Sequence, residues 1–280
     1  YHNPKQVGEN VPSTLQIGEP SVITYHTNIL VISDFRVMDI VAGGEGAPLV
    51  PMSEYLLYKN ENKSIILQNL GGIGNLTYIP KGATIDDVIA FDTGPGNVMI
   101  DYFTKKYFNL PYDEDGKIAL KGKVLNEVLD YLMDDEFIKR IPPKSTGREK
   151  YTKEFMEKLA YQFSFVNKDK EDVITMVTEF TVKSMLYHYQ NFLKDIDLVI
   201  VNGGGSHNNY IMKRLKEELK CSVLTGDEYG IASDAKEAIA FVVLGYLTLN
   251  NRWGNVKSAT GAKRNVILGK ITPREEKRWV

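Results

Sequence analysis

The stretch DVIAFDTGPGN, residues 87–97, combines an acid with a tight glycine turn. An apolar run leads into Asp92, Gly94 and Gly96 follow it, and Asn97 precedes a stretch with helical spacing. Glycine lacks a Cβ, so it can take positive φ and lets a ligand approach the peptide N–H groups closely. The following helix would add its unpaired N–H groups and the positive end of its dipole. The segment therefore predicts a phosphate-binding turn.

Asp92 needs its own explanation, because a carboxylate does not itself bind phosphate. At the end of a strand beside a phosphate, it could hold a metal ion or take a proton from a nucleophile, and kinases use both roles. The competing interpretation is structural, since aspartates in turns often hydrogen-bond to local backbone. This segment alone leaves both interpretations open.

A second glycine turn, VNGGGSHN, spans residues 201–208. A continuously apolar run precedes Gly203, Gly204 and Gly205, as expected of a buried parallel strand, and a helix is predicted at about 208–220. Bare backbone would let a flat ring or a ribose lie against the chain, whereas the competing interpretation is a flexible turn or tight helix packing. The chain has no GxxxxGK[ST] and no GxGxxG after a strand, which disfavours P-loop and dinucleotide-binding proteins. The two turns together favour another class of nucleotide site.

Three further segments suit a hydroxyl-rich ligand. DFRVMDIVAGGEGAPLVP, residues 34–51, places charged side chains around glycines, and Arg36 could bind a carboxylate through two N–H groups. PPKSTGRE, residues 142–149, could form a stiff basic lip, with Lys144 and Arg148, that closes over phosphate or a lactyl group. Glu237 begins an apolar helical segment and could accept hydrogen bonds from sugar hydroxyls. The competing interpretations are solvated surface loops and, for Glu237, a favourable place near a helix N-terminus.

The elements that must position these residues follow an α/β pattern. From residue 29 to 94 short β-rich runs dominate, and QNLGGIGN is predicted to join two of them as a hairpin. After residue 96 the apolar spacing becomes helical, which indicates a helical insertion, and a longer helix is predicted at about 171–193. The strand-like runs DLVIVN and SVLT and a last apolar helix complete an alternation of β and α segments.

Bulk composition excludes several classes of function. A formal net charge of −2 over 280 residues leaves no basic excess to attract nucleic acid or an acidic membrane surface. The single cysteine, Cys221, and four scattered histidines do not form a zinc-binding set. The sequence shows no run of about 18 apolar residues and no basic-then-apolar leader. We therefore expect a cytoplasmic protein without disulfides and without a nucleic-acid or membrane partner.

Eight motifs in order resemble the anhydro-N-acetylmuramic acid kinases of bacterial cell-wall recycling, and the match runs nearly end to end. They are LQIGEP, DFRVMDIVAGGEGAPLVP, QNLGGIGNLT, FDTGPGN, PPKSTGRE, VNGGGSHN, DAKEAIAF and SATGA. The resemblance implies the sugar-kinase, actin and heat-shock chaperone superfamily, in which two RNase H-like α/β domains close on ATP. It implies a partial first domain with the sugar-binding loop at 1–86, and a second domain with the phosphate and adenosine motifs at 87–280.

The resemblance also implies a role for each candidate residue. Enzymes of this family use ATP and Mg²⁺ to phosphorylate O6 of the sugar while water opens the 1,6-anhydro ring at C1, which gives N-acetylmuramic acid 6-phosphate. Asp92 would be the catalytic base that activates this water, and a homodimer is expected. Contacts to the sugar are implied for Arg36, Gly43, Gly44, Arg148 and Glu237. Contacts to the nucleotide are implied for Gly94, Gly96, Asn97, Gly203, Gly204, Gly205 and Asn208.

One family motif is not found in this sequence. The family opens with a first phosphate loop rich in glycine, threonine and serine and bearing an aspartate, so we expect an incomplete first domain here. Positioning supplies most of the catalysis in phosphoryl transfer, so we also expect poor turnover by this chain alone. Two alternatives stay open: another carbohydrate kinase of the same superfamily, or a non-catalytic nucleotide-binding fragment.

Overall fold

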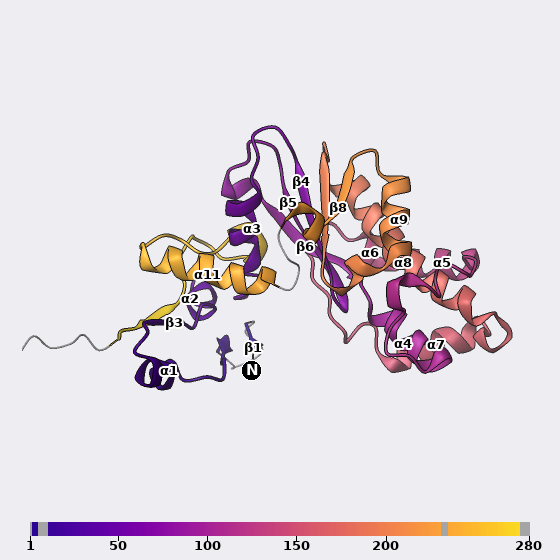
Figure 1. Cartoon of the computed structure of the whole chain (residues 1–280), viewed down its shortest axis with the longest axis horizontal. Helices are drawn as coiled ribbons and strands as arrows, with labels where there is room; N and C mark the ends of the chain where they lie inside the picture. Colours follow the sequence, from indigo (N-terminus) through magenta and orange to yellow (C-terminus); the bar gives the residue numbers. More distant parts are fainter. Residues whose placement is uncertain (1, 5–10, 231–234, 275–280) are drawn as a thin grey trace, which may run out of the picture. The chain divides into compact units, whose positions relative to one another are not determined.

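The computed structural model describes residues 2–4, 11–230 and 235–274 and divides the chain into two compact units (Figure 1). Unit 1 comprises Tyr1–Lys59, Ala83–Val88 and Ala235–Val280. Unit 2 comprises Asn60–Gly82 and Ile89–Asp234. Both units are therefore assembled from segments that are not contiguous in the sequence.

Unit 2 is built on a five-stranded sheet with the strand order β6-β5-β4-β7-β8. The strands are β4 (Ile65–Leu70), β5 (Ile73–Ile79), β6 (Ile89–Pro95), β7 (Leu198–Asn202) and β8 (Ser222–Thr225). β5 pairs antiparallel with both β4 and β6, whereas β7 pairs parallel with both β4 and β8. Of the five strands of this sheet, only β5, the second in sequence order, runs antiparallel to the others. This is the topology of an RNase H-like sheet. The predicted α/β fold and the predicted hairpin at QNLGGIGN are confirmed.

One long helix, α8 (Lys170–Phe192), organises the core of unit 2. Its Val173, Val177 and Phe180, which lie at helical spacing, are almost completely buried. They share one apolar cluster with alternate residues of the strands, among them Ile66 and Val199. Because side chains alternate between the two faces of a strand, this cluster defines the sheet face that α8 covers. The helix predicted at about 171–193 is confirmed.

The remaining helices of unit 2 include the predicted helical insertion between β6 and α8. The α-helices are α4 (Val98–Phe108), α5 (Asn126–Met133), α6 (Glu136–Lys139), α7 (Lys153–Gln162), α9 (Asn209–Glu218) and α10 (Gly226–Tyr229). Short 3₁₀ turns occur at Glu114–Gly116, Phe165–Asn167 and Gly204–His207. α4, α5 and α9 all pack against α8, so α8 lies at the centre of the helical layer.

Unit 1 contains short strands and helices. The strands are β1 (His2–Asn3), β2 (Ser13–Thr14), β3 (Val31–Ser33) and β9 (Lys270–Thr272), in the antiparallel pairs β1-β2 and β3-β9. The helices are α1 (Pro20–Thr27), α2 (Val37–Val41), α3 (Val50–Tyr58), a 3₁₀ turn at Ile85–Asp87, α11 (Lys236–Leu249) and α12 (Lys257–Thr260).

Residues 235–274 pack with unit 1, although their position in the sequence suggests the second domain. α11 lies against α3, and the Lys236 ammonium pairs with the Glu54 carboxylate at 2.6 Å between two nearly buried side chains. Breaking such a pair would leave a buried charge uncompensated, so the pair ties α11 to α3.

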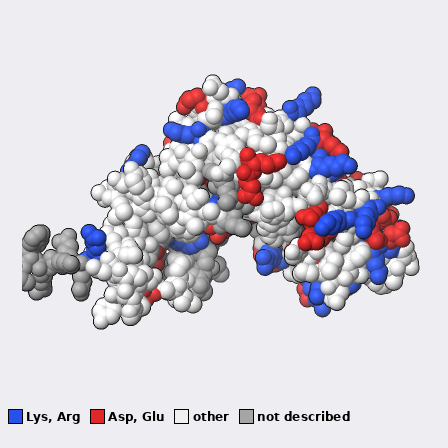
Figure 2. Space-filling view, in the orientation of Figure 1, with Lys and Arg blue, Asp and Glu red and all other residues white. Residues whose placement is uncertain are grey.

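Charged side chains are unevenly distributed over the face in Figure 2. Lysines, arginines and acids mix over unit 2, whereas the visible surface around α1 and α11 carries few of them. Large apolar side chains are exposed on α11 and just beyond it, including Val242 (71% exposed) and Trp253 (59%). Within the described residues, no helix combines the length and the apolar character that a membrane crossing requires.

Asp39 holds together the glycine-rich segment of unit 1. Its carboxylate is fully buried and accepts hydrogen bonds at 2.8 Å from the Gly46 N–H, the Asn255 amide and the Thr260 hydroxyl. These donors belong to sequence segments more than 200 residues apart. A buried charge needs such a complete set of donors, so Asp39 has a structural role here.

We expect Asp39→Ala to destabilise unit 1 by at least about 3 kcal/mol, because it leaves three donors without an acceptor and each costs about 1–3 kcal/mol. Denaturant unfolding of the purified protein measures the change. Asp86→Ala is the matched control, since Asp86 is exposed and pairs with Lys257 at 3.1 Å near the surface, where a pair contributes little. Equal unfolding midpoints for the two variants would contradict this role for Asp39.

Candidate functional site

Two glycine turns meet at one end of the sheet in unit 2. The N–H groups of Gly96 and Val98 donate to the Gly72 carbonyl at 2.9 and 3.1 Å, and the Asn97 N–H donates to the Gly71 carbonyl at 2.8 Å. A Cβ on Gly96 would lie 2.3 Å from the Gly71 oxygen, so this close approach requires glycine. The N–H groups that the sequence offers to a phosphate are therefore paired with the β4-β5 turn in this structure.

α8 supports the same turn from the buried side. The Thr181 hydroxyl donates to the Gly96 carbonyl at 2.9 Å, and the Ser184 hydroxyl donates to the Thr93 carbonyl. Gly94 has a φ of +112°, and a Cβ there would lie 2.8 Å from the Ser184 hydroxyl oxygen. Gly94 thus meets both a backbone requirement and a packing requirement, and its predicted contact with nucleotide stays a prediction.

Asp92 lies half-buried near the end of β6, and a loop covers one of its carboxylate oxygens. The Thr146 N–H donates to Asp92 Oδ2 at 2.8 Å, and the Asp92 N–H donates to the Lys144 carbonyl at 3.2 Å. Burial raises the pKa of Asp92 to about 6, the Thr146 N–H opposes that rise, and the nearby Glu149 carboxylate adds to it. A carboxyl group whose pKa lies near neutrality can exchange protons under physiological conditions.

Arg148 reaches the β4-β5 turn from the 142–149 loop. Its exposed side chain lies against Gly72, where an added Cβ would come within 3.0 Å of Arg148 Nε. Burial raises the pKa of Asp101, on the first turn of α4, to about 6, and the Arg148 charge opposes this rise. The structure thus brings Arg148 to the β4-β5 turn, which is hydrogen-bonded to the glycine turn after Asp92.

The two predicted nucleotide motifs meet beside the end of β4. Gly203 has a φ of +80°, and Cβ atoms on Gly203 and Gly205 would lie 2.8 Å from the Leu70 oxygen and 2.6 Å from Leu70 Cβ. The Asn97 amide donates to the same Leu70 oxygen at 3.0 Å. Gly204 differs, because it is exposed and an added Cβ would meet only Asn97 Nδ2, at 3.8 Å. Packing within the protein therefore explains Gly203 and Gly205 but does not explain Gly204.

Asn208 caps the helix that follows the triple glycine. Its buried side-chain oxygen accepts from the Tyr210 and Ile211 N–H groups at 3.0 and 3.2 Å at the start of α9. Asparagine is among the preferred residues at this position. The cap explains Asn208 structurally, and its contact with nucleotide stays a prediction.

A row of polar residues crosses four strands and was missed from the sequence. Register pairs Asp92 with Asn75, Asn75 with Asn69, and Asn69 with Asn202, so the row runs from β6 to β7. Asn202 is 1% exposed, and neither atom of its amide has a partner among the residues that the structure describes. Because such a buried group is costly to leave unpaired, we expect a water molecule or a ligand to pair with it. The available signal was an asparagine or aspartate at one end of each apolar run.

The sugar-binding candidates of unit 1 cluster only in part. Arg36 Nη1 donates to the Gly46 carbonyl at 2.7 Å, and Gly44 is buried where a Cβ would lie 2.3 Å from Asp39 Oδ2. Gly43 is exposed with a φ of +87°. Glu237 lies exposed on a separate element, the first turn of α11. Their contacts with sugar stay predictions.

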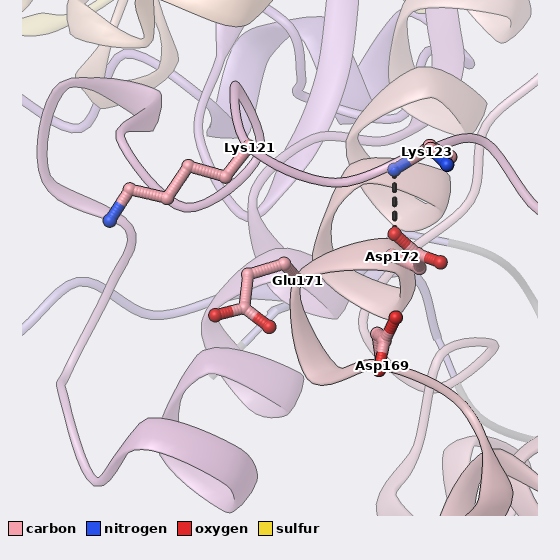
Figure 3. A pocket seen from close by; sticks show the side chains of 5 residues that line it. All are labelled: Lys121, Lys123, Asp169, Glu171 and Asp172. Atoms are coloured by element: carbon pink, nitrogen blue, oxygen red, sulfur yellow. Dashed lines mark hydrogen bonds between the residues drawn. The ribbon is translucent and has the colours of Figure 1, made fainter.

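A surface pocket of about 260 Å³ is distinct from these residues (Figure 3). Its lining is Lys121, Lys123, Asp169, Glu171 and Asp172. The Lys123 N–H donates to Asp172 Oδ1 at 2.7 Å, the bond drawn in Figure 3. Asp169 precedes Thr181 by roughly 18 Å along α8, at 1.5 Å per residue. None of the predicted site residues lines this pocket, and no group of three or more His, Cys, Asp or Glu suited to a metal ion occurs in the described residues.

Comparison with known proteins gives consistent matches over the chain. A family model described as anhydro-N-acetylmuramic acid kinase matches residues 1–274. The anhydro-N-acetylmuramic acid kinase of Clostridioides difficile strain 630 is 54% identical over 278 residues, which cover 98% of this chain and 72% of that protein. The enzyme of the same name from Bacillus cereus strain 03BB102 is 50% identical over 97% of this chain and 72% of its own length.

Among solved structures, the chain is similar to the activator of the 2-hydroxyisocaproyl-CoA dehydratase from Clostridium difficile with bound ADPNP. That match has a TM-score of 0.41 and 12% identity, and it covers 69% of this chain and 62% of that one. Component A of the Acidaminococcus fermentans (R)-2-hydroxyglutaryl-CoA dehydratase gives a TM-score of 0.38 and 13% identity over 69% and 67% of the two chains.

The contrast between Gly204 and Gly205 separates ligand contact from packing. We expect Gly204→Ala to leave the melting temperature unchanged, because the added Cβ would enter open space beside the backbone. Nucleotide binding should weaken at least about tenfold, because the Cβ would take the space where the ligand lies. Gly205→Ala should lower the melting temperature, because its Cβ would overlap Leu70. Calorimetric titration with a non-hydrolysable ATP analogue and thermal unfolding measure the two effects. Unchanged affinity in Gly204→Ala would remove Gly204 from the nucleotide site.

Proposed function

The chain belongs to the anhydro-N-acetylmuramic acid kinase family, and from that premise we propose that the full-length protein phosphorylates anhydro-N-acetylmuramic acid at O6 with ATP. Water opens the 1,6-anhydro ring at C1 in the same reaction, so the products are N-acetylmuramic acid 6-phosphate and ADP. The physiological role would be the recycling of peptidoglycan. The observation that carries this proposal is the half-buried Asp92, which lies beside two glycine turns and has a pKa raised to about 6.

Asp92 would act as the general base for ring opening. Its carboxylate takes one proton from water while the water oxygen bonds to C1 and the C1–O6 bond breaks. O6 then bonds to the γ-phosphorus, ADP leaves, and the second water proton remains on the new C1 hydroxyl. Asp92 finally releases its proton to solvent. A base whose pKa lies just below neutrality is largely ionised at pH 7 and still binds a proton well, which supports this role.

The nucleotide would lie against the exposed backbone of Gly204, next to the Asn97 side chain. Open space beside Gly204 supports a flat ring or a ribose there, and the Arg148 guanidinium is suited to an anionic group near the β4-β5 turn. Mg²⁺ bound by nucleotide enzymes commonly takes phosphate oxygens with only one or two carboxylates. We therefore propose that Mg²⁺ enters with ATP and lowers the negative charge on the phosphates.

The sugar contacts belong to the same proposal. Arg36 could bind the lactyl carboxylate, Gly43 and Gly44 would offer backbone beside the ring, and Glu237 would accept hydrogen bonds from its hydroxyls. The exposure of Gly43 and Glu237 is compatible with these roles. The homodimer and the cytoplasmic location are proposals that rest on the family alone.

In the full-length protein, we expect Asp92→Asn to retain nucleotide binding and to lose about 10²–10⁴-fold in product formation, the usual contribution of general base catalysis. The amide keeps an oxygen for the Thr146 N–H but cannot take a proton. Mass spectrometry of the sugar phosphate measures the loss, with Asp86→Asn as the exposed control. Near-normal turnover would rule out the role of Asp92. Phosphorylation of N-acetylmuramic acid, with none of the anhydro sugar, would favour another carbohydrate kinase.

The proposed base also predicts a pH dependence. Because the raised pKa of Asp92 is about 6, the carboxylate is ionised above pH 6, and kcat should fall about tenfold per pH unit below it. Initial rates between pH 5 and 9 at saturating substrates measure this limb. Asp101 also has a pKa of about 6, so Asp101→Asn is the control and should leave the limb in place. Loss of the limb in that variant would assign the titration to Asp101.

A further inference from the structure

Lys144 is buried, although its place in PPKSTGRE suggests an exposed basic lip. Only 6% of the residue is exposed, and its ammonium donates to the Phe137 and Ile138 carbonyls at 2.8 and 3.0 Å. Both carbonyls belong to the short helix α6. The Lys144 Nζ also lies over the rings of Phe137 and Phe192, at 4.7 and 5.3 Å from their centroids. The side chain therefore fixes the loop to α6 from inside the protein.

The main chain of the same residue reaches Asp92. The Lys144 carbonyl accepts the Asp92 N–H at 3.2 Å, and two residues later the Thr146 N–H donates to Asp92 Oδ2 at 2.8 Å. One short segment thus connects the α6 carbonyls to both the backbone and the carboxylate of Asp92. The other carboxylate oxygen accepts no hydrogen bond from the part of the chain that the structure describes.

The surroundings of Lys144 show that its burial is not electrostatically neutral. Burial lowers the pKa of Lys144 to about 8, the Arg140 and Lys150 charges lower it further, and Asp135 opposes them. The Lys144 charge in turn helps to lower the pKa of His188, on α8, to about 4. A buried ammonium with two cationic neighbours costs free energy, and the α6 carbonyls and the aromatic rings offset only part of this cost. A lysine exposed to solvent would avoid this cost, so the burial calls for a compensating role.

We propose that Lys144 is the positioning residue of Asp92. By fixing the loop to α6, its ammonium keeps the Thr146 N–H directed at Asp92 Oδ2 and leaves the other oxygen for the proton of water. This inference rests on the proposed function, because it assumes that Asp92 is the base. Burial is the largest cause of the raised pKa of Asp92; the Thr146 N–H lowers this pKa and the Glu149 carboxylate raises it, and both groups belong to the 142–149 loop. A small shift of the loop that turns the Thr146 N–H away from Asp92 therefore changes the titration of Asp92 and not only the stability of the protein.

Lys144→Met in the full-length protein tests this role, because it keeps the length of the side chain and removes the ammonium. The methionine can stay packed between Phe137 and Phe192, so the loop still covers Asp92 and burial continues to raise its pKa. Only the Thr146 N–H loses its direction, and we therefore expect the acidic limb of kcat to move upward by roughly one pH unit. The fall in kcat should consequently be larger at pH 6 than at pH 8, with KM for ATP within about twofold. Lys144→Arg can still donate to both carbonyls and should restore most of the wild-type profile.

Lys139→Met is the matched control, because Lys139 lies on α6, the helix that Lys144 contacts, but is exposed and pairs with Asp134. It should show the wild-type profile. A folded Lys144→Met protein with an unmoved limb, or with a fall in kcat equal at every pH, would overturn the inference. If Lys144→Met does not fold, Thr146→Pro decides the matter, since it removes the N–H itself and should move the limb in the same direction. Absence of a limb near pH 6 in the wild type would instead count against Asp92 as base.

Discussion

The contact between two glycine turns is the constraint on which the site depends. Three backbone hydrogen bonds join Gly96, Asn97 and Val98 to the carbonyls of Gly71 and Gly72, at a separation that excludes any side chain on Gly96. This contact fixes the end of β6 and the start of α4, and thereby the direction in which Asp92 and Asn97 leave the backbone. Thr181 and Ser184 of α8 complete the support from the core. The turn is thus held by hydrogen bonds within the protein without any ligand.

Asp39 and Asp92 both lie near glycine turns, but their environments differ, and the difference distinguishes a structural acid from a candidate catalytic one. Asp39 is fully buried and accepts three hydrogen bonds, so its carboxylate has a partner on both oxygens. Asp92 is half-buried and receives one bond, and burial raises its pKa to about 6. A carboxylate with donors on both oxygens is committed to holding the fold, whereas one with a single donor keeps an oxygen open to water or a ligand. The number of donors therefore indicates which acid is available for catalysis.

The sequence predicts the elements better than it predicts the reasons for individual residues. Apolar runs and helical spacing place the strands, α4 and α8 correctly, because these signals are local. The sequence also identifies the glycines within 94–96 and 203–205. Glycine is required at Gly96 and Gly205, however, because Gly71 and Leu70 lie so close, and a local pattern cannot reveal these neighbours. The polar row through Asn75, Asn69 and Asn202 depends on strand register. Lys144 likewise looks like a surface residue in the sequence, because its burial depends on contacts with α6 that a local pattern does not show.

The paired turns also limit how a phosphate can bind. Using the N–H groups of Gly96, Asn97 and Val98 would require breaking three hydrogen bonds, each with a net contribution of about 0.5–1.5 kcal/mol, and moving Gly71 away. The backbone of Gly204 and the Arg148 guanidinium are exposed and need no such rearrangement. We therefore expect the Arg148 guanidinium to hold the anionic part of a nucleotide first, while the ring or ribose lies against the Gly204 backbone. The turn would then serve mainly to hold Asp92 in place, and the loop that Lys144 fixes to α6 would determine which carboxylate oxygen of Asp92 stays open.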